Sequence, residues 1–179
     1  MNRFRNLVIP ALGAMVGLVL TSTVAMAQDP DTKTGTATAF AEIIAPIAIT
    51  WVADMNFGSI VPSAGGTVAL PASATPTRVA TGPTLGDPDD VASAQFTVTG
   101  EPGKTYAITL PGNGEVELDG PALSDPMTVT AFISSPTVAA GGLLTAGTQT
   151  LYVGATLNVA ADQAAGVYDG DFDVTVTYN

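Results

Sequence analysis

The side chains that most often perform catalysis or bind transition metals are absent from this sequence. Its 179 residues include no histidine and no cysteine. A Ser-His-Asp or Cys-His catalytic arrangement is therefore impossible, and so is a zinc site built from the usual ligands. No Walker loop or dinucleotide-binding fingerprint occurs. Paired carboxylates can hydrolyse glycosides, but here the acidic residues fall in predicted loops and on wet strand faces. We expect no catalytic residues and no cofactor.

Carboxylates are clustered in two segments, and carboxylate oxygens are ligands that a divalent cation could use. Asp87, Asp89 and Asp90 lie in one predicted loop, and Ca²⁺ takes about six to eight oxygen ligands, often from such loops. Three further aspartates alternate along residues 169–173, where side chains two positions apart are separated by about 6.8 Å. That spacing is too wide for one ion. Neither segment follows the EF-hand pattern, so we expect solvated carboxylates and no metal site, with Asp87, Asp89 and Asp90 as the Ca²⁺ candidates.

The first 27 residues have the pattern of a secretory signal peptide. Arg3 and Arg5 precede an apolar run over residues 7–20, and the small residues of Ala25-Met26-Ala27 follow. The apolar run is shorter than the roughly 20 residues that a membrane-spanning helix needs, so we expect cleavage and no membrane span afterwards. The protein would then be exported to the periplasm, the cell surface or the exterior. The predicted organisation is a signal peptide over 1–27, a flexible leader over 28–35 and a single domain over 36–179.

The charge and composition of the chain narrow the class of protein. The formal net charge is −11, and only Lys33, Arg78 and Lys104 are basic after residue 27, against 16 acidic residues. An acidic surface argues against nucleic acid or anionic lipid as a partner, since both need a basic face. The lack of cysteine means that the domain folds without disulfides. No sustained helical period occurs, so the domain should be all-β.

The last stretch, residues 165–179, shows the clearest strand pattern in the chain. Its apolar positions alternate with Asp169, Asp171, Asp173 and two threonines, as expected for a strand with one buried and one wet face. Gly166 permits a turn into this strand. The predicted pairing residues are Gly166, Tyr168, Phe172, Val174, Val176 and Tyr178.

This terminal pattern resembles the last strand of chaperone–usher pilus subunits. Those subunits end in alternating apolar residues with an aromatic next to last, here Tyr178, and a glycine fourteenth from the end, here Gly166. The resemblance implies a strand that pairs with a periplasmic chaperone and later flanks a groove filled by another subunit. Any secreted sandwich that ends in a strand can show the same alternation.

A second alternating segment opens the predicted domain. Residues 36–45 are followed by Pro46, which cannot donate a ladder hydrogen bond and so marks a break, a bulge or an edge. One interpretation is a strand that slots into a neighbouring subunit. The other is an ordinary first strand of the same domain. The proposed assembly residues are Ala37, Ala39, Ala41, Ile43 and Ala45.

Short alternating runs separated by Gly, Pro and Asp fill the rest of the chain. About nine or ten short strands at this spacing predict an antiparallel β-sandwich of immunoglobulin-like or pilin-like type. Residues 94–100 and 104–110 are separated by Glu101-Pro102-Gly103, which indicates a hairpin or another close connection. The further expected strands are 67–70, 77–81, 115–119, 127–133 and 148–159.

Four segments together resemble a family of secreted domains of unknown function from Gram-negative bacteria, which is similar to pilins and spore-coat-type subunits. They are MNFGSIVPSAGGTV, AQFTVTGEPGKTYAITLP, TQTLYVGATLNV and AGVYDGDFDVTVTYN. The resemblance implies no catalytic residue. Unlike disulfide-bearing pilins, this chain has no cysteine.

The sequence therefore predicts a non-enzymatic, exported structural subunit of the cell surface or of a fimbria-like assembly. It would assemble by β-strand complementation, in which main-chain hydrogen bonds give affinity and alternate side chains set the register. The expected partners are copies of itself, related subunits or a periplasmic chaperone. The alternative is a self-contained module that binds carbohydrate or matrix, which an exposed cluster of Trp51 and tyrosines would favour.

Overall fold

The computed structural model describes residues 32–88 and 90–179 and separates the chain into two units, Met1–Ala41 and Glu42–Asn179. The predicted signal peptide, most of the predicted leader and Asp89 lie outside the described residues. In the first unit, residues 32–41 are exposed and carry no strand. The second unit contains every strand of the described chain, and we call it the domain.

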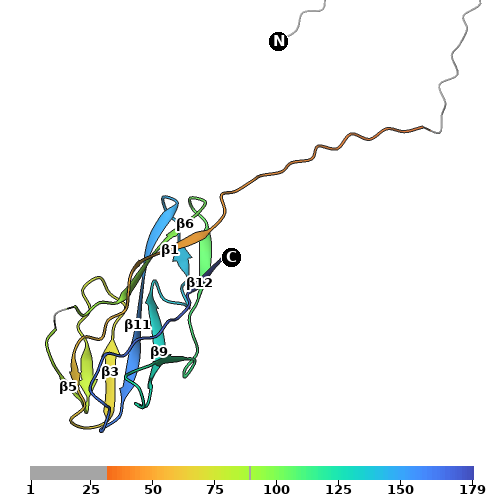
Figure 1. Ribbon diagram of the computed structural model, residues 1–179. Helices are drawn as coiled ribbons and strands as arrows, with labels where there is room; N and C mark the ends of the chain where they lie inside the picture. Colours follow the sequence, from red (N-terminus) through yellow and green to blue (C-terminus); the bar gives the residue numbers. More distant parts are fainter. Residues whose placement is uncertain (1–31, 89) are drawn as a thin grey trace, which may run out of the picture. The chain divides into compact units, whose positions relative to one another are not determined.

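The domain is all-β, with no helix among its described residues, and its antiparallel strands form a sandwich-like fold as predicted (Figure 1). Several strands are only two or three residues long, so their number exceeds the nine or ten expected. In chain order they are β1 (Ala48–Ala53), β2 (Ile60–Val61), β3 (Gly66–Leu70), β4 (Val79–Thr81), β5 (Thr84–Leu85), β6 (Ala94–Thr99), β7 (Thr105–Thr109), β8 (Val116–Leu118), β9 (Met127–Ser135), β10 (Gly142–Leu143), β11 (Thr148–Val159) and β12 (Thr175–Tyr178).

Strand β11 organises the larger sheet and runs along the domain beside β9 and β3 (Figure 1). Its first half pairs with β6, its second half with β3, and its middle with β9, all antiparallel. β1 extends the sheet beyond β6, β4 lies beyond β3 and β8 beyond β9. The predicted bounds of this strand, 148–159, are confirmed. Leu151, Val153, Ala155, Leu157 and Val159 are buried along it, as a period of two requires.

The smaller sheets complete the fold. One has the order β10-β7-β12, and another consists of β2 and β5. The core has two parts, one around each half of β11. The first half contacts buried residues such as Val98 and Tyr106, and the second half contacts others such as Val68 and Val129. Phe172, half-buried, packs against both parts, and its ring lies 5.2 Å from that of Phe132.

Three details of the sequence interpretation need correction or refinement. First, β6 and β7 do not form a hairpin, because they lie in different sheets, and the short 100–104 segment is the close connection between those sheets. Second, residues 36–45 form no strand in this chain, and β1 begins only at Ala48. Third, the last strand pairs only over Thr175–Tyr178, although the alternation of half-buried and exposed side chains from Tyr168 to Tyr178 follows the predicted pattern, apart from exposed Gly170.

Candidate functional site

An open groove lies on one side of the domain, over the part of the core that surrounds the second half of β11. Its volume is about 930 Å³. Its floor consists of apolar side chains from three neighbouring strands, which otherwise form the sandwich core. These are Val116 and Leu118 of β8, Met127, Val129 and Phe132 of β9, and Leu157 and Val159 of β11. Part of the hydrophobic core is therefore bordered by a groove rather than by another complete strand.

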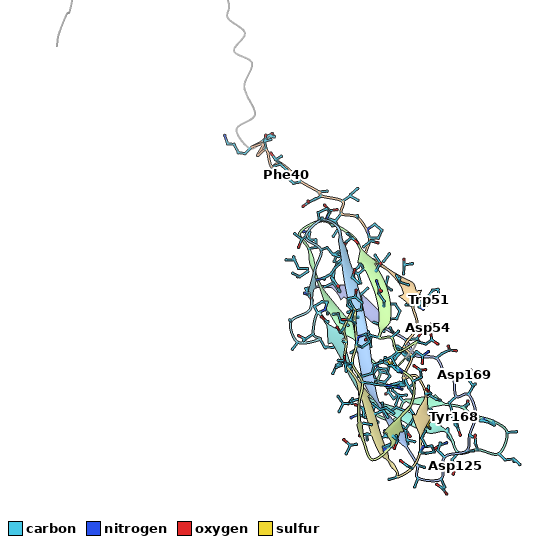
Figure 2. The ribbon with its side chains drawn as sticks, turned by 90° about the vertical axis from the view of Figure 1, so that its left-hand side faces the viewer. Phe40, Trp51, Asp54, Asp125, Tyr168 and Asp169 are labelled. Atoms are coloured by element: carbon cyan, nitrogen blue, oxygen red, sulfur yellow. The ribbon has the colours of Figure 1, made fainter. Side chains whose placement is uncertain are left out.

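Two chain segments form the long walls of the groove. The N-terminal wall is residues 53–60, which leave β1, and the C-terminal wall is residues 163–172, which lead toward β12. Figure 2 shows Trp51 and Asp54 from one wall region and Tyr168 and Asp169 from the other along the same side of the domain. The sequence indicated the second wall through its alternating pattern, but it did not indicate that residues 53–60 face it.

The C-terminal wall has few main-chain partners. Asp169 exchanges two backbone hydrogen bonds with Asp119, at 2.8 and 3.0 Å. Beyond it, residues 170–173 make no backbone hydrogen bond to any other described residue. Ordered pairing resumes only at Thr175, opposite Thr109 of β7. An extended segment with unpaired N–H and C=O groups is a template for an additional strand.

The N-terminal wall is attached to the domain by a different device. Asn56 pairs with Ala92 through two backbone hydrogen bonds of 2.8 and 3.0 Å. The Asn56 side chain also accepts the Gly58 N–H at 2.7 Å. Gly58 has φ of 67°, and a Cβ there would lie 2.7 Å from Nη1 of Arg78. Glycine therefore both permits the turn and makes room for the arginine.

Arg78 is a buried cation, 7% exposed, that stands behind this wall. Its guanidinium donates to four main-chain carbonyls: to Phe57, to Ser59 at 2.8 Å, to Gly86 at 3.0 Å and to Asp87 at 2.7 Å. A buried charge is tolerated only when its hydrogen-bonding groups are satisfied. Arg78 thus joins the groove wall to the 86–87 loop. The sequence interpretation counted Arg78 only as one of three basic residues, because one arginine between short strands gives no local signal of such a role.

Polar and aromatic side chains border the apolar floor. Trp51 is 61% exposed, and its indole N–H donates to the Asp54 carboxylate at 2.9 Å. On the opposite wall, the Tyr168 hydroxyl donates to the Ala164 carbonyl at 2.9 Å and accepts from the Gln163 amide at 2.9 Å. Asp169 and Asp171 also line the groove. The rim is acidic, which matches the excess of acidic residues in the chain.

The predicted C-terminal pairing residues divide between the groove and the far sheet. Tyr168 and Phe172 line the groove, and exposed Gly166 lies there too, where a Cβ would meet the Pro121 ring. Val174, Val176 and Tyr178 are half-buried against the core around the first half of β11. One continuous sequence pattern therefore serves two environments, a groove wall and an ordinary edge strand.

The predicted assembly residues, Ala37, Ala39, Ala41, Ile43 and Ala45, are all exposed and lie outside every strand. Two large apolar side chains of this segment, Phe40 and Ile43, are more than nine-tenths exposed. Ala45 alone in this segment makes hydrogen bonds to remote residues, namely Glu101 and Tyr178. We call residues 36–45 the arm.

The Ca²⁺ candidates do not converge on an ion site in the described residues. Asp87 and Asp90 are exposed, and Asp89 lies outside the described chain. Where the structure is described, no group of three or more acidic side chains is close enough to hold a metal ion. The main-chain carbonyls of Gly86 and Asp87 bind the guanidinium of Arg78. In this loop an internal side-chain cation occupies carbonyl oxygens of the kind that Ca²⁺ would use.

Fold and site together define an antiparallel β-sandwich with an open, apolar-floored groove. A comparison with known families matches residues 47–178 to a domain of unknown function, DUF4402, and the chain belongs to that family. No curated protein and no solved structure matches the chain. Within residues 32–88 and 90–179, no helix is long and apolar enough to cross a membrane.

Proposed function

We propose that this protein is an exported structural subunit that assembles at the cell surface or in a fimbria-like structure by β-strand complementation. The observation that carries the proposal is the groove, in which the apolar core is bordered by two segments instead of a complete strand. A strand laid between these walls would pack on the floor, most of whose side chains are already buried, and would pair with the unpaired main chain of residues 170–173. This is the arrangement that β-strand addition uses.

The arm of a second copy is the proposed occupant. Its ten residues span about 33 Å when extended, and the N-terminal wall, with eight residues, spans about 26 Å. The arm is therefore long enough to follow the wall from end to end. Ala37, Ala39, Ala41 and Ile43 would face the floor, and burial of their exposed apolar surface would drive binding by about 25 cal/mol per Å².

The test uses the full mature chain, residues 28–179, with Ala39→Glu and Ala41→Glu in the arm. We call this the arm variant; its groove can accept an arm, but its own arm cannot enter the groove of another copy. Trp51 is the single tryptophan and lines the groove, so its emission reports occupancy. We expect a synthetic 36–45 peptide to shift the Trp51 emission saturably. The same peptide with glutamate at positions 39 and 41 should not, because it would place charges on the apolar floor.

Two further measurements complete the test of assembly. Light scattering should show that the wild-type mature chain self-associates and that the arm variant is monomeric. A Met55→Glu variant, which puts a charge on the N-terminal wall, should not bind the wild-type peptide. If the wild-type chain is monomeric and no strand peptide binds the arm variant, strand complementation is refuted.

A second candidate function is a binding module, and the position of Trp51 favours it. The exposed Trp51 ring is held by Asp54, and Tyr168 lies on the other wall of the same groove. Aromatic rings flanked by carboxylates and amides are suited to the apolar faces and hydroxyls of a carbohydrate. Binding of oligosaccharides in the absence of any strand binding, measured by the same Trp51 emission, would select this function instead.

A further inference from the structure

The point where the arm joins the domain is fixed by contacts that the proposed function does not itself require. The Ala45 N–H donates to the Glu101 carboxylate at 3.0 Å, and the Ala45 carbonyl accepts from the Tyr178 hydroxyl at 2.9 Å. Both main-chain groups of one exposed residue are therefore held by side chains from remote parts of the sequence. We call Ala45, Glu101 and Tyr178 the clasp.

The clasp is built into the fold rather than formed by mobile surface groups alone. The Tyr178 hydroxyl also accepts the Glu101 N–H at 2.6 Å, so the hydroxyl is both a donor and an acceptor in fixed directions. The Tyr178 ring packs against the core around the first half of β11. A Cβ at Gly100 would lie 2.2 Å from the hydroxyl oxygen, so glycine at this position leaves the space that the hydroxyl occupies.

Pro46 directly follows Ala45 and indicates an alternative path for the chain. Proline is favoured as the second residue of a β-turn, in which the first carbonyl accepts from the fourth N–H. Such a turn at 45–48 would join the Ala45 carbonyl to the Ala48 N–H. This bond is not formed in the described domain, where the Ala45 carbonyl accepts from Tyr178 instead.

That turn would lead the arm into its own domain. The chain would run back along β1, whose only strand partner in the described structure is β6, so its other edge has no paired strand, although β1 also contacts β12. β1 ends at Ala53, where the N-terminal wall of the groove begins. A turned arm would thus pair along β1 and bring residues 36–39 beside the first part of the N-terminal wall of the same chain, without a second copy.

We propose, as an extension that rests on the function proposed above, that Glu101 and Tyr178 are positioning residues that keep the arm from folding back along its own β1 and leave it for a second copy. A contact in which each copy donates to the next and accepts from the previous one is heterologous, and it produces an open chain of subunits unless rotation closes a ring. The clasp then decides between a monomer whose arm pairs with its own β1 and an assembly.

The test compares Tyr178→Phe with wild type in the mature chain. Phenylalanine keeps the packed ring and removes the hydroxyl that binds Ala45. We expect self-association, measured by light scattering across a concentration series, to weaken about five- to tenfold. This is the change expected when two hydrogen bonds, to the Ala45 carbonyl and from the Glu101 N–H, are lost in a largely exposed setting. Hydrogen exchange should show residues 36–44 protected in the monomer of this variant and unprotected in the wild-type monomer.

Three further variants make the result specific. Glu101→Ala leaves the Tyr178 ring in place and should act in the same direction, which preserves the test if Tyr178→Phe does not fold. Tyr152→Phe removes a hydroxyl for which no hydrogen bond is formed among the described residues and should change nothing. Adding Pro46→Ala to Tyr178→Phe should restore association, because it disfavours the turn.

The outcomes separate the clasp from the groove. If the arm variant binds the 36–45 peptide but Tyr178→Phe and Glu101→Ala associate as tightly as wild type with an unprotected arm, the clasp inference is overturned and the proposed function stands. If association weakens but the arm of the monomer stays unprotected, the clasp stabilises the assembly in another way and the inference also fails. If no strand peptide binds the groove, the proposed function fails first.

Discussion

Replacing Arg78 should destabilise this domain far more than replacing any other basic residue of the described chain. The substitution Arg78→Met keeps much of the side-chain length but removes all the donors that bind the carbonyls of the groove wall and of the 86–87 loop. The buried Phe57 carbonyl would lose its bond to the guanidinium, and so would the part-buried carbonyl of Ser59.

The size of the effect follows from these contacts. Hydrogen bonds to a charged group contribute about 1.5–3 kcal/mol each. Their sum over four carbonyls is an overestimate, because water can reach the part-buried acceptors after the change. We expect a loss of about 3–4 kcal/mol in the free energy of unfolding, a large share of the roughly 5–15 kcal/mol of a typical domain. Arg78→Lys keeps the charge but loses the planar fork, so it should cost about half as much.

Urea unfolding measures this loss directly. With a slope of about 2 kcal/mol per M, the midpoint of Arg78→Met should fall by about 1.5–2 M. Lys104→Met is the matched control, since it removes the same charge from an exposed position, and it should shift the free energy by less than about 0.5 kcal/mol. Equal midpoints for Arg78→Met and Lys104→Met would refute the role given to the guanidinium. A wild-type midpoint for Arg78→Lys would show that the charge, not the fork, is what matters.

Two other predictions concern the core. Phe172→Ala should lower the free energy of unfolding by about 2–3 kcal/mol, the low part of the range for a large apolar side chain because Phe172 is only half-buried. Asp171→Ala, on the exposed side of the same segment, should change it by less than about 0.5 kcal/mol, and equal effects would mean that the facing is wrong. Burial raises the pKa of the Tyr106 hydroxyl above its ordinary value of 10.0. The stability from this neutral phenol is therefore complete below about pH 10 and is lost as pH rises through the raised pKa, so urea midpoints between about pH 9 and 11 should fall more steeply for wild type than for Tyr106→Phe.

Sequence reasoning located only one of the two walls of the groove. Alternation over residues 168–178 identified one wall and the faces of its side chains, because a strand-like backbone puts successive side chains on opposite sides. Residues 53–57 also alternate between half-buried or buried and exposed side chains, but alternation does not say which segment lies opposite them. Arg78 binds the main-chain carbonyls of Phe57 and Ser59, which no side-chain pattern reports. Main-chain contacts of this kind depend on position in space and leave little trace in the identities of the residues that supply them.

The contacts of the clasp could not be predicted from the sequence either. Pro46 marked a break after the arm, but neither Glu101 nor Tyr178 could be matched to Ala45, from which they are separated by 56 and 133 positions. The aromatic residue next to last was noticed as part of a terminal pattern. The hydrogen bond from its hydroxyl to the arm was not predicted, because an alternating apolar pattern indicates where the ring is buried but not what the hydroxyl binds.

The sequence by itself determined the class of the fold, the bounds of β11, the faces of the terminal segment and the exclusion of histidine and cysteine chemistry. These properties are local: a period of two assigns side chains to faces, and composition states which groups exist. Only the tertiary structure decided that β6 and β7 enter different sheets, that two remote segments border one groove, and that Arg78 and Tyr178 bind distant carbonyls. The physical reason is that periodicity specifies which side of a strand is buried but not which strand lies beside it. Partners are selected by the packing of the whole domain, in which one buried cation or one hydroxyl can join segments that share no sequence pattern.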